Sequence, residues 1–130
     1  MYGTQTDDNT LTNSYLNNTT NSLFVIPDQT IVSFRSETLA VRIGGSADLG
    51  AVGDFKAWVE TGVAMQRNGS DLIIDSGRDV IGKTGVTAGW VPQVSGSGNN
   101  FLQTVTGANN RDIMWATTIT FTQIKTGVDL

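Results

Sequence analysis

The sequence contains neither cysteine nor histidine in its 130 residues. Without cysteine, a disulfide framework and any thiolate metal site are excluded. Without histidine, the chain lacks the commonest general base, the commonest metal ligand and the usual partner of a serine nucleophile. No S-x-x-K or G-x-S-x-G pattern offers an alternative nucleophile. The sequence therefore predicts a protein that is not an enzyme and that needs no cofactor.

Charge is also scarce, at 15% of residues with a net charge of −4. The eight lysines and arginines are spread singly along the chain, whereas nucleic-acid binding needs them clustered. No stretch approaches the roughly 20 apolar residues of a membrane span. No basic residue precedes Arg35 and no apolar run opens the sequence, which does not fit a secretory signal. We expect neither a nucleic-acid nor a membrane partner, and export, if any, by cell lysis.

The first 21 residues form a compositional unit, because eleven of them are asparagine or threonine. Four isolated apolar side chains interrupt this unit: Tyr2, Leu11, Tyr15 and Leu16. Such a segment cannot form a core by itself. It is either a disordered tail or an extended arm that orders against a neighbouring subunit. We expect the arm, with these four residues as partner-binding residues.

From residue 22 onward, short runs of alternating apolar and polar residues are separated by glycine-rich turns. The runs predict strands at 22–25, 30–43, 55–66, 71–75, 87–94, 101–106 and 113–122. Residues 44–54 and 95–100 are predicted loops, and Asn68-Gly69 predicts a type I′ hairpin turn. Pro92 suggests an edge strand. The sequence therefore predicts an all-β, antiparallel sandwich or jelly roll of seven or eight strands, with residues 1–21 as the arm and 22–130 as the domain.

Three tryptophans are candidates for the core, for an interface or for a sugar-stacking platform. Trp115 shares a strongly apolar strand face with Ile113, which indicates the core. Trp58 shares its face with Gly62 and Ala64, so it either closes the second half of the core or packs at an interface. We expect Trp58 to be a partner-binding residue as well.

The segment from Gly77 to Thr84 matches the phosphate-loop pattern G-x-x-x-x-G-K-[ST] letter for letter. That loop requires a helix directly after its lysine, because the helix N-terminus holds the phosphates. The residues that follow Thr84 are rich in glycine and β-branched side chains, so the match is attributed to chance in a glycine-rich chain.

Acidic residues offer two further sites, both of which have simpler explanations. Asp71, Asp75 and Asp79 recur every four residues, but a calcium loop needs closer spacing and a terminal glutamate. Glu37 and Glu60 lie within predicted strands, and Glu60 shares a face with Lys56, which suggests a surface ion pair rather than a hydrolytic pair. No metal site is expected.

Several segments together resemble a known group of proteins. They are Val52-Gly53-Asp54-Phe55-Lys56-Ala57-Trp58, Gly62, the Asn68-Gly69 hairpin, Gly89-Trp90, and Ile113-Met114-Trp115-Ala116-Thr117 ahead of Gln123. The chain from about Thr30 to Ile124 resembles small glycine- and threonine-rich β domains among the virion proteins of tailed bacteriophages. Family members often carry a longer, more apolar segment after the first hairpin, whereas residues 71–85 are polar and broken by glycine.

The resemblance implies a structural protein of the phage particle surface, with no catalytic residues. We expect a capsid decoration (cement) protein, as a homotrimer that contacts the major capsid protein and copies of itself. The alternative is a tail-fibre or receptor-binding module that recognises a cell-surface glycan through exposed aromatic side chains.

Overall fold

A computed structural model describes residues 2–16, 24–67, 71–128 and 130, and in these residues every regular element is a β-strand. The strands are β1 (Tyr2–Thr6), β2 (Leu11–Leu16), β3 (Phe24–Val25), β4 (Thr30–Gly44), β5 (Phe55–Gln66), β6 (Ile73–Thr84), β7 (Val91–Ser97), β8 (Asn100–Thr106) and β9 (Asp112–Lys125). All pairings between them are antiparallel. The prediction of an all-β antiparallel sandwich is confirmed. In the described part of the chain, no helix is long and apolar enough to cross a membrane.

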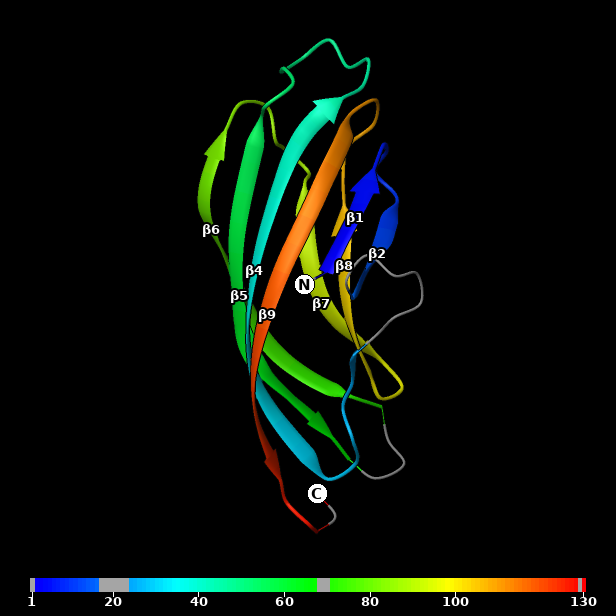
Figure 1. Ribbon diagram of the computed structural model, residues 1–130, viewed down its shortest axis with the longest axis vertical. Helices are drawn as coiled ribbons and strands as arrows, with labels where there is room; N and C mark the ends of the chain where they lie inside the picture. Colours follow the sequence, from blue (N-terminus) through cyan, green and yellow to red (C-terminus); the bar gives the residue numbers. More distant parts are fainter. Residues whose placement is uncertain (1, 17–23, 68–70, 129) are drawn as a thin grey trace.

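The strands form two packed layers joined along one side (Figure 1). The front sheet has the order β6-β5-β4-β9-β1, and its long central strands β5, β4 and β9 twist strongly along their length. The back sheet consists of β7, β8, β2 and β3, with β8 at its centre. The β1–β2 hairpin connects the layers, because β1 pairs with β9 and β2 pairs with β8. β7 pairs with β8, an edge position as Pro92 indicated.

The N-terminal segment differs from the predicted arm. Its strands β1 and β2 are extended, but they pair with strands of the same chain instead of reaching outward. Trp115 Nε1 also donates a buried hydrogen bond of 2.9 Å to Thr6 Oγ1. Threonine-rich strands can make the full set of ladder hydrogen bonds even with few apolar side chains, and the edges of β8 and β9 supply the partners. Residues 17–21, the rest of the predicted arm, lie outside the described residues.

The interior is divided into two apolar halves. The lower half contains Ile26, Val32, Phe34, Ala64, Leu72, Val94 and Phe101. The upper half contains Ala40, Trp58, Trp90, Val105, Ile113 and Trp115. In both halves aromatic rings meet, with Phe34 edge-on to Phe101 at 5.0 Å and Trp58 stacked on Trp115 at 5.6 Å. Burial of these large rings stabilises the fold.

A belt of buried polar side chains separates the two halves. Ser36 Oγ donates to Gln103 Oε1 at 3.2 Å, and the Thr38 and Thr117 hydroxyls are 2.8 Å apart. Ser76 Oγ donates to Glu60 Oε2 at 2.7 Å. On β4, β5, β8 and β9 alike, the polar residue of the belt lies between apolar residues of the two halves. Glu60 is therefore an inward-facing belt residue, and the predicted surface pair with Lys56 is wrong.

Strand β6 is longer than the sequence predicted. It runs the whole length of β5, and Leu72, just before it, is buried. The polar, glycine-containing stretch forms a strand because β5 offers it a row of backbone hydrogen bonds, while its edge position tolerates exposed polar side chains. The predicted loop at 95–100 is shorter than expected, since β7 ends at Ser97 and β8 begins at Asn100. The predicted turn at 68–70 lies outside the described residues.

Candidate functional site

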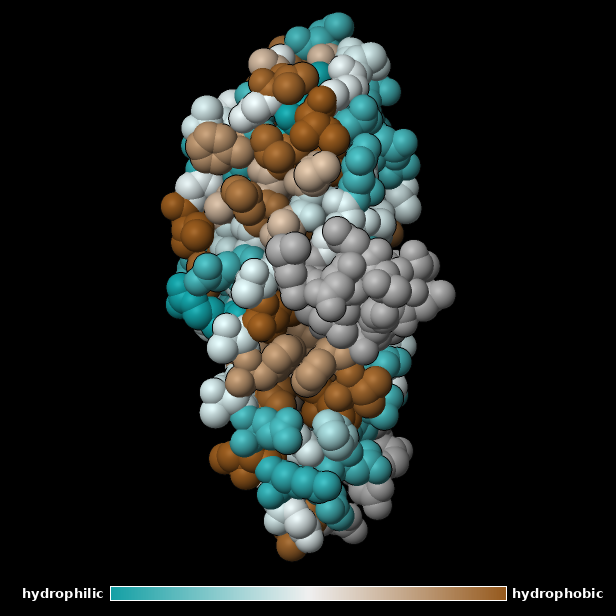
Figure 2. Space-filling view, viewed as in Figure 1, coloured by the Kyte–Doolittle hydropathy of each residue, from teal (hydrophilic) through white to brown (hydrophobic). Residues whose placement is uncertain are grey.

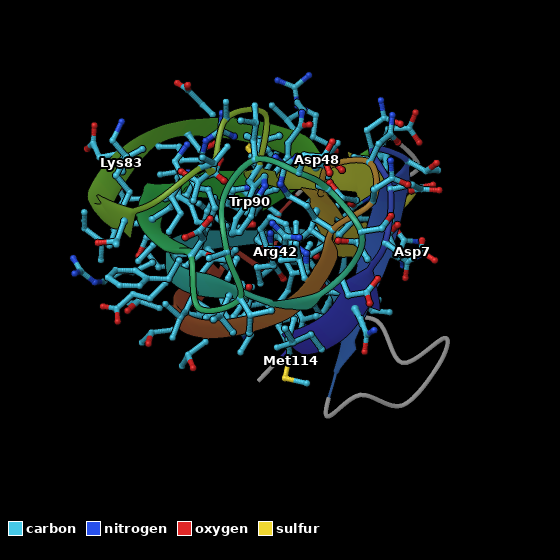
Figure 3. All side chains as sticks on the ribbon, turned by 90° about the horizontal axis from the view of Figure 1, so that it is seen from above. Asp7, Arg42, Asp48, Lys83, Trp90 and Met114 are labelled. Atoms are coloured by element: carbon cyan, nitrogen blue, oxygen red, sulfur yellow. The ribbon has the colours of Figure 1, made fainter. Side chains whose placement is uncertain are left out.

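The outward face of the front sheet carries exposed apolar side chains. At the upper end of the sheet, Leu39 is 53%, Phe55 40% and Met114 50% exposed. Figure 2 shows hydrophobic side chains gathered over the upper halves of β5, β4 and β9. Met114 points away from the molecule in the view from above (Figure 3). We call this surface the upper outer face.

On β5 the sequence pattern alone would assign Phe55 and its outward-facing neighbours to the core. On β5, Phe55, Val59 and Val63 lie on the outward face, whereas Trp58 and Glu60 face inward. In this orientation the Trp58 ring stacks on Trp115, with the ring centroids 5.6 Å apart, and is buried in the upper half of the core. The outward face remains apolar as a result.

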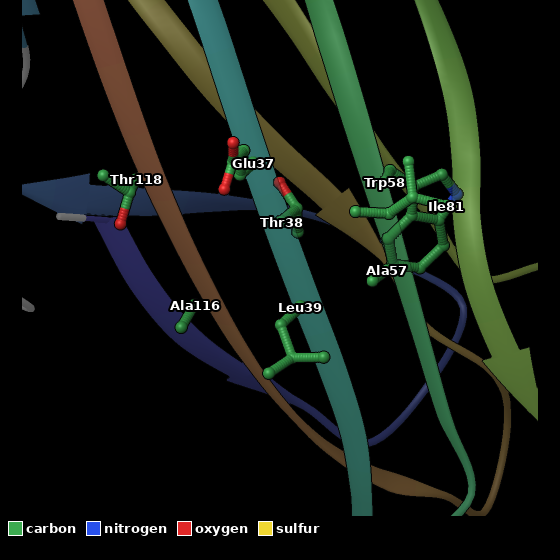
Figure 4. Close-up of a pocket in the computed structure, with 8 residues that line it drawn as sticks. All are labelled: Glu37, Thr38, Leu39, Ala57, Trp58, Ile81, Ala116 and Thr118. Atoms are coloured by element: carbon green, nitrogen blue, oxygen red, sulfur yellow. The ribbon is translucent and has the colours of Figure 1, made fainter.

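A shallow groove of about 370 Å³ lies in the upper outer face. It is lined by Glu37, Thr38, Leu39, Ala57, Trp58, Ile81, Ala116 and Thr118. Figure 4 shows these residues on four neighbouring strands, with Ala116 and Thr118 on β9, Leu39 on β4, Ala57 on β5 and Ile81 on β6. Glu37 is the charged residue of this lining, and its Oε1 accepts a hydrogen bond of 3.0 Å from Arg35 Nε.

The strand register places large and small side chains of the groove side by side. Leu39 is paired with Ala57 on β5 and with Ala116 on β9. On β6 the register shifts by one residue, so that Gly82 pairs with Ala57, and Ile81 is the extra residue of a β-bulge. Ile81 lines the groove and is 61% exposed. Across the four strands the sequence of side chains is therefore large, small, large, small: Ile81, Ala57, Leu39, Ala116.

At the top of the molecule, the β4–β5 loop is organised around a buried arginine. The Arg42 guanidinium donates to four backbone carbonyls at 2.9–3.2 Å, those of Gly44, Gly45, Ala47 and Leu49. Figure 3 shows Arg42 near the centre of this end with the loop around it. Its side chain is a structural support, since its donors are occupied by the loop's own carbonyls.

Asp54, at the end of the same loop, holds two further segments. Its carboxylate accepts hydrogen bonds from the backbone N–H groups of Ala51 at 2.9 Å and Val86 at 3.1 Å. These hydrogen bonds, aided by the charges of Arg42 and Arg111, lower the pKa of the Asp54 carboxyl below its usual range. The Asp54 carboxylate therefore ties the β4–β5 loop to the β6–β7 connection.

The five residues predicted to bind a partner do not form one site. Trp58 is 2% exposed and belongs to the upper half of the core, so of its two interpretations the structure shows the core one. Leu11 is 59% exposed on β2, in the back sheet. Tyr2, Tyr15 and Leu16 lie on the paired strands β1 and β2. Apart from Trp58, the residues that line the groove were missed, because alternation identifies two faces of a strand without saying which is buried.

The motifs that suggested chemistry lie in ordinary strand structure. The phosphate-loop match occupies β6, and Thr84 is followed by a turn at Gly85 instead of a helix. Asp75 and Asp79 are exposed on the same strand. In the described residues, no three aspartate or glutamate side chains gather closely enough to hold a metal ion.

No family model and no curated protein matches the chain. Among solved structures, it is similar to the tailspike protein of Acinetobacter baumannii phage AM24, with 11% identity and a TM-score of 0.48. The match covers 98% of this chain and 27% of the tailspike chain, so this chain spans about a quarter of that protein's length. At this level of similarity, the function has to be argued from the chain's own residues.

Proposed function

We propose that the protein is a structural component of a bacteriophage particle, which acts by surface contact and performs no reaction. The observation that carries the proposal is the apolar, grooved upper outer face on a sandwich whose three tryptophans are all buried. Monomeric soluble proteins seldom expose contiguous apolar surface of this kind unless it binds something. The assignment to a phage particle comes from the sequence resemblance described above.

The contact function can serve at two places on a particle. A decoration protein binds the assembled shell and stabilises it by linkage, because it binds the assembled state and not the free subunits. A tail-fibre module contacts other tail proteins or the host surface. Glycan recognition through tryptophan is not supported, since Trp58, Trp90 and Trp115 are each 2% exposed.

Mass spectrometry of particles purified from an infected culture tests the proposal. The protein should co-purify with the particles at a fixed ratio to the coat protein. A ratio near one identifies a decoration protein, and a ratio far below one identifies a tail component. Recovery only in the particle-free fraction would contradict the particle assignment.

A further inference from the structure

We propose that the upper outer face pairs with the same face of a second copy of this chain. The two copies are related by a two-fold axis that lies in the interface, runs parallel to the strands and passes over the boundary between β4 and β5. The proposal rests on the contact function above and names the partner of that surface. Its basis is the alternation of large and small side chains across the groove.

A surface is self-complementary under a two-fold rotation when each protrusion faces a depression after the rotation. Rotation about an axis between β4 and β5 reverses the order of the four strands. The row Ile81, Ala57, Leu39, Ala116 then faces Ala116, Leu39, Ala57 and Ile81 of the second copy. Every large side chain of the row meets an alanine, and the contact is made twice by symmetry.

The neighbouring rows are compatible with this pairing. In the next outward-facing row toward the β4–β5 loop, Val41 is paired with Phe55 on β5 and with Met114 on β9. After the rotation Val41 faces Phe55 of the second copy, so apolar side chains meet again. Two sheets packed face to face lie about 10 Å apart, with their strands within about 30° of parallel, which leaves room for one interdigitated layer of side chains.

The charged side chains at the border of the groove are compatible with a second copy. Arg35 and Glu37 lie at the lower border of the groove and already form an ion pair with each other. After the rotation Glu37 faces Val59 of the second copy, and Asp79 of the same row faces Thr118, so no two like charges lie directly opposite each other. A partner with a strongly basic or acidic surface would find no matching charge in the groove lining, where Glu37 is neutralised by Arg35.

The oligomeric state in solution, measured by analytical ultracentrifugation of the full chain, tests the pairing. The wild-type chain should show a concentration-dependent species of twice the 13.9 kDa monomer mass. Leu39→Arg should weaken the association about tenfold or more, because each arginine would be buried against an alanine. Ile124→Arg is the matched control: Ile124 is 64% exposed on β9 at the other end of the sheet, and its substitution should leave the association unchanged.

A mixture of two single variants tests the register. Leu39→Arg and Ala57→Asp should each fail to pair with themselves. Mixed together they should form a heterodimer, because one contact then joins arginine to aspartate and the other keeps the native leucine and alanine. Rescue by Ala116→Asp in place of Ala57→Asp would overturn the axis between β4 and β5.

A wild-type chain that remains monomeric at millimolar concentration would overturn the pairing. If this monomer still co-purifies with particles, the proposed contact function survives and the pairing alone fails. Thermal unfolding of each variant by circular dichroism verifies that the substitutions leave the fold intact. All of the substituted positions are on the strand surface, so this result is expected.

Discussion

Single side chains at the top of the molecule illustrate how polar groups substitute for a metal or a disulfide. The β4–β5 loop has no cysteine to close it, and its carbonyls converge on the Arg42 guanidinium. A planar group with five donors suits this task, whereas a lysine would offer only one compact charge.

Replacing Arg42 by alanine should lower the free energy of unfolding by about 2–4 kcal/mol, because a buried side chain is removed and four loop carbonyls lose their hydrogen bonds to it at once. Urea unfolding followed by tryptophan fluorescence measures the change. Arg35→Ala is the control: Arg35 forms an ion pair with Glu37 whose side chains are 58% and 55% exposed, and its loss should cost at most about 0.5 kcal/mol. Equal losses in the two variants would contradict the supporting role of Arg42.

Asp54 should make the free energy of unfolding fall as the pH is lowered. Because its pKa in the folded state lies below the unfolded value, the carboxylate stabilises the fold above the unfolded pKa of about 4, and this contribution is lost as the pH falls through the folded pKa. Thermal unfolding from pH 6 to pH 2 should therefore show a steeper decline for the wild type than for Asp54→Asn. Parallel curves would contradict this prediction.

At the scale of elements, the positions of the long strands and the buried face of β9 were predictable from the sequence, whereas the buried face of β5 was not. Residues 30–43, 55–66 and 113–122 alternate cleanly, and β4, β5 and β9 occupy these ranges with small extensions. The buried face of β5 depends on whether Trp58 meets Trp115, a contact between residues 57 positions apart. Local periodicity contains no information about such a contact.

The groove could not be predicted from the sequence either, because it also depends on contacts between strands that are distant in the chain. Its row of four side chains comes from four strands, and the place of Ile81 depends on the β-bulge on β6. The N-terminal strands were missed because asparagine and threonine carry little apolar signal. Their pairing partners, β8 and β9, lie about 90 to 115 residues further along the chain.

The β1–β2 hairpin should be required for folding, since it closes one side of the sandwich. Thr6→Val removes the acceptor of the Trp115 indole N–H and should lower the free energy of unfolding by about 1–3 kcal/mol.

Deleting residues 1–16 should broaden or abolish the cooperative unfolding transition, because the edges of β8 and β9 are then unpaired. Gln5→Ala, an exposed neighbour on β1, serves as the control in urea unfolding and should behave like the wild type. Full cooperativity in the deletion variant would restore the interpretation of this segment as an arm that binds a neighbouring subunit and is not needed for folding.

For the whole molecule, net charge opposes self-association. Each copy carries a charge of −4, and pairing brings these charges together. Raising the salt concentration from about 0.02 M to about 0.2 M shortens the Debye length and should strengthen the pairing several-fold. Sedimentation velocity at both concentrations measures this change. Pairing that weakens with salt would instead indicate an interface held by ion pairs between the copies.

The polar belt across the interior affects how stability responds to temperature. Exposure of apolar surface raises the heat capacity on unfolding, whereas exposure of polar surface lowers it. An interior in which Ser36, Thr38, Glu60, Gln103 and Thr117 take the places of hydrocarbon side chains therefore has a smaller heat-capacity increment than an all-apolar interior of equal size. A smaller increment flattens the stability curve, so the folded state loses little free energy on either warming or chilling. In the proposed role as a component of a phage particle, the protein would keep its fold over a wide range of surroundings outside the host.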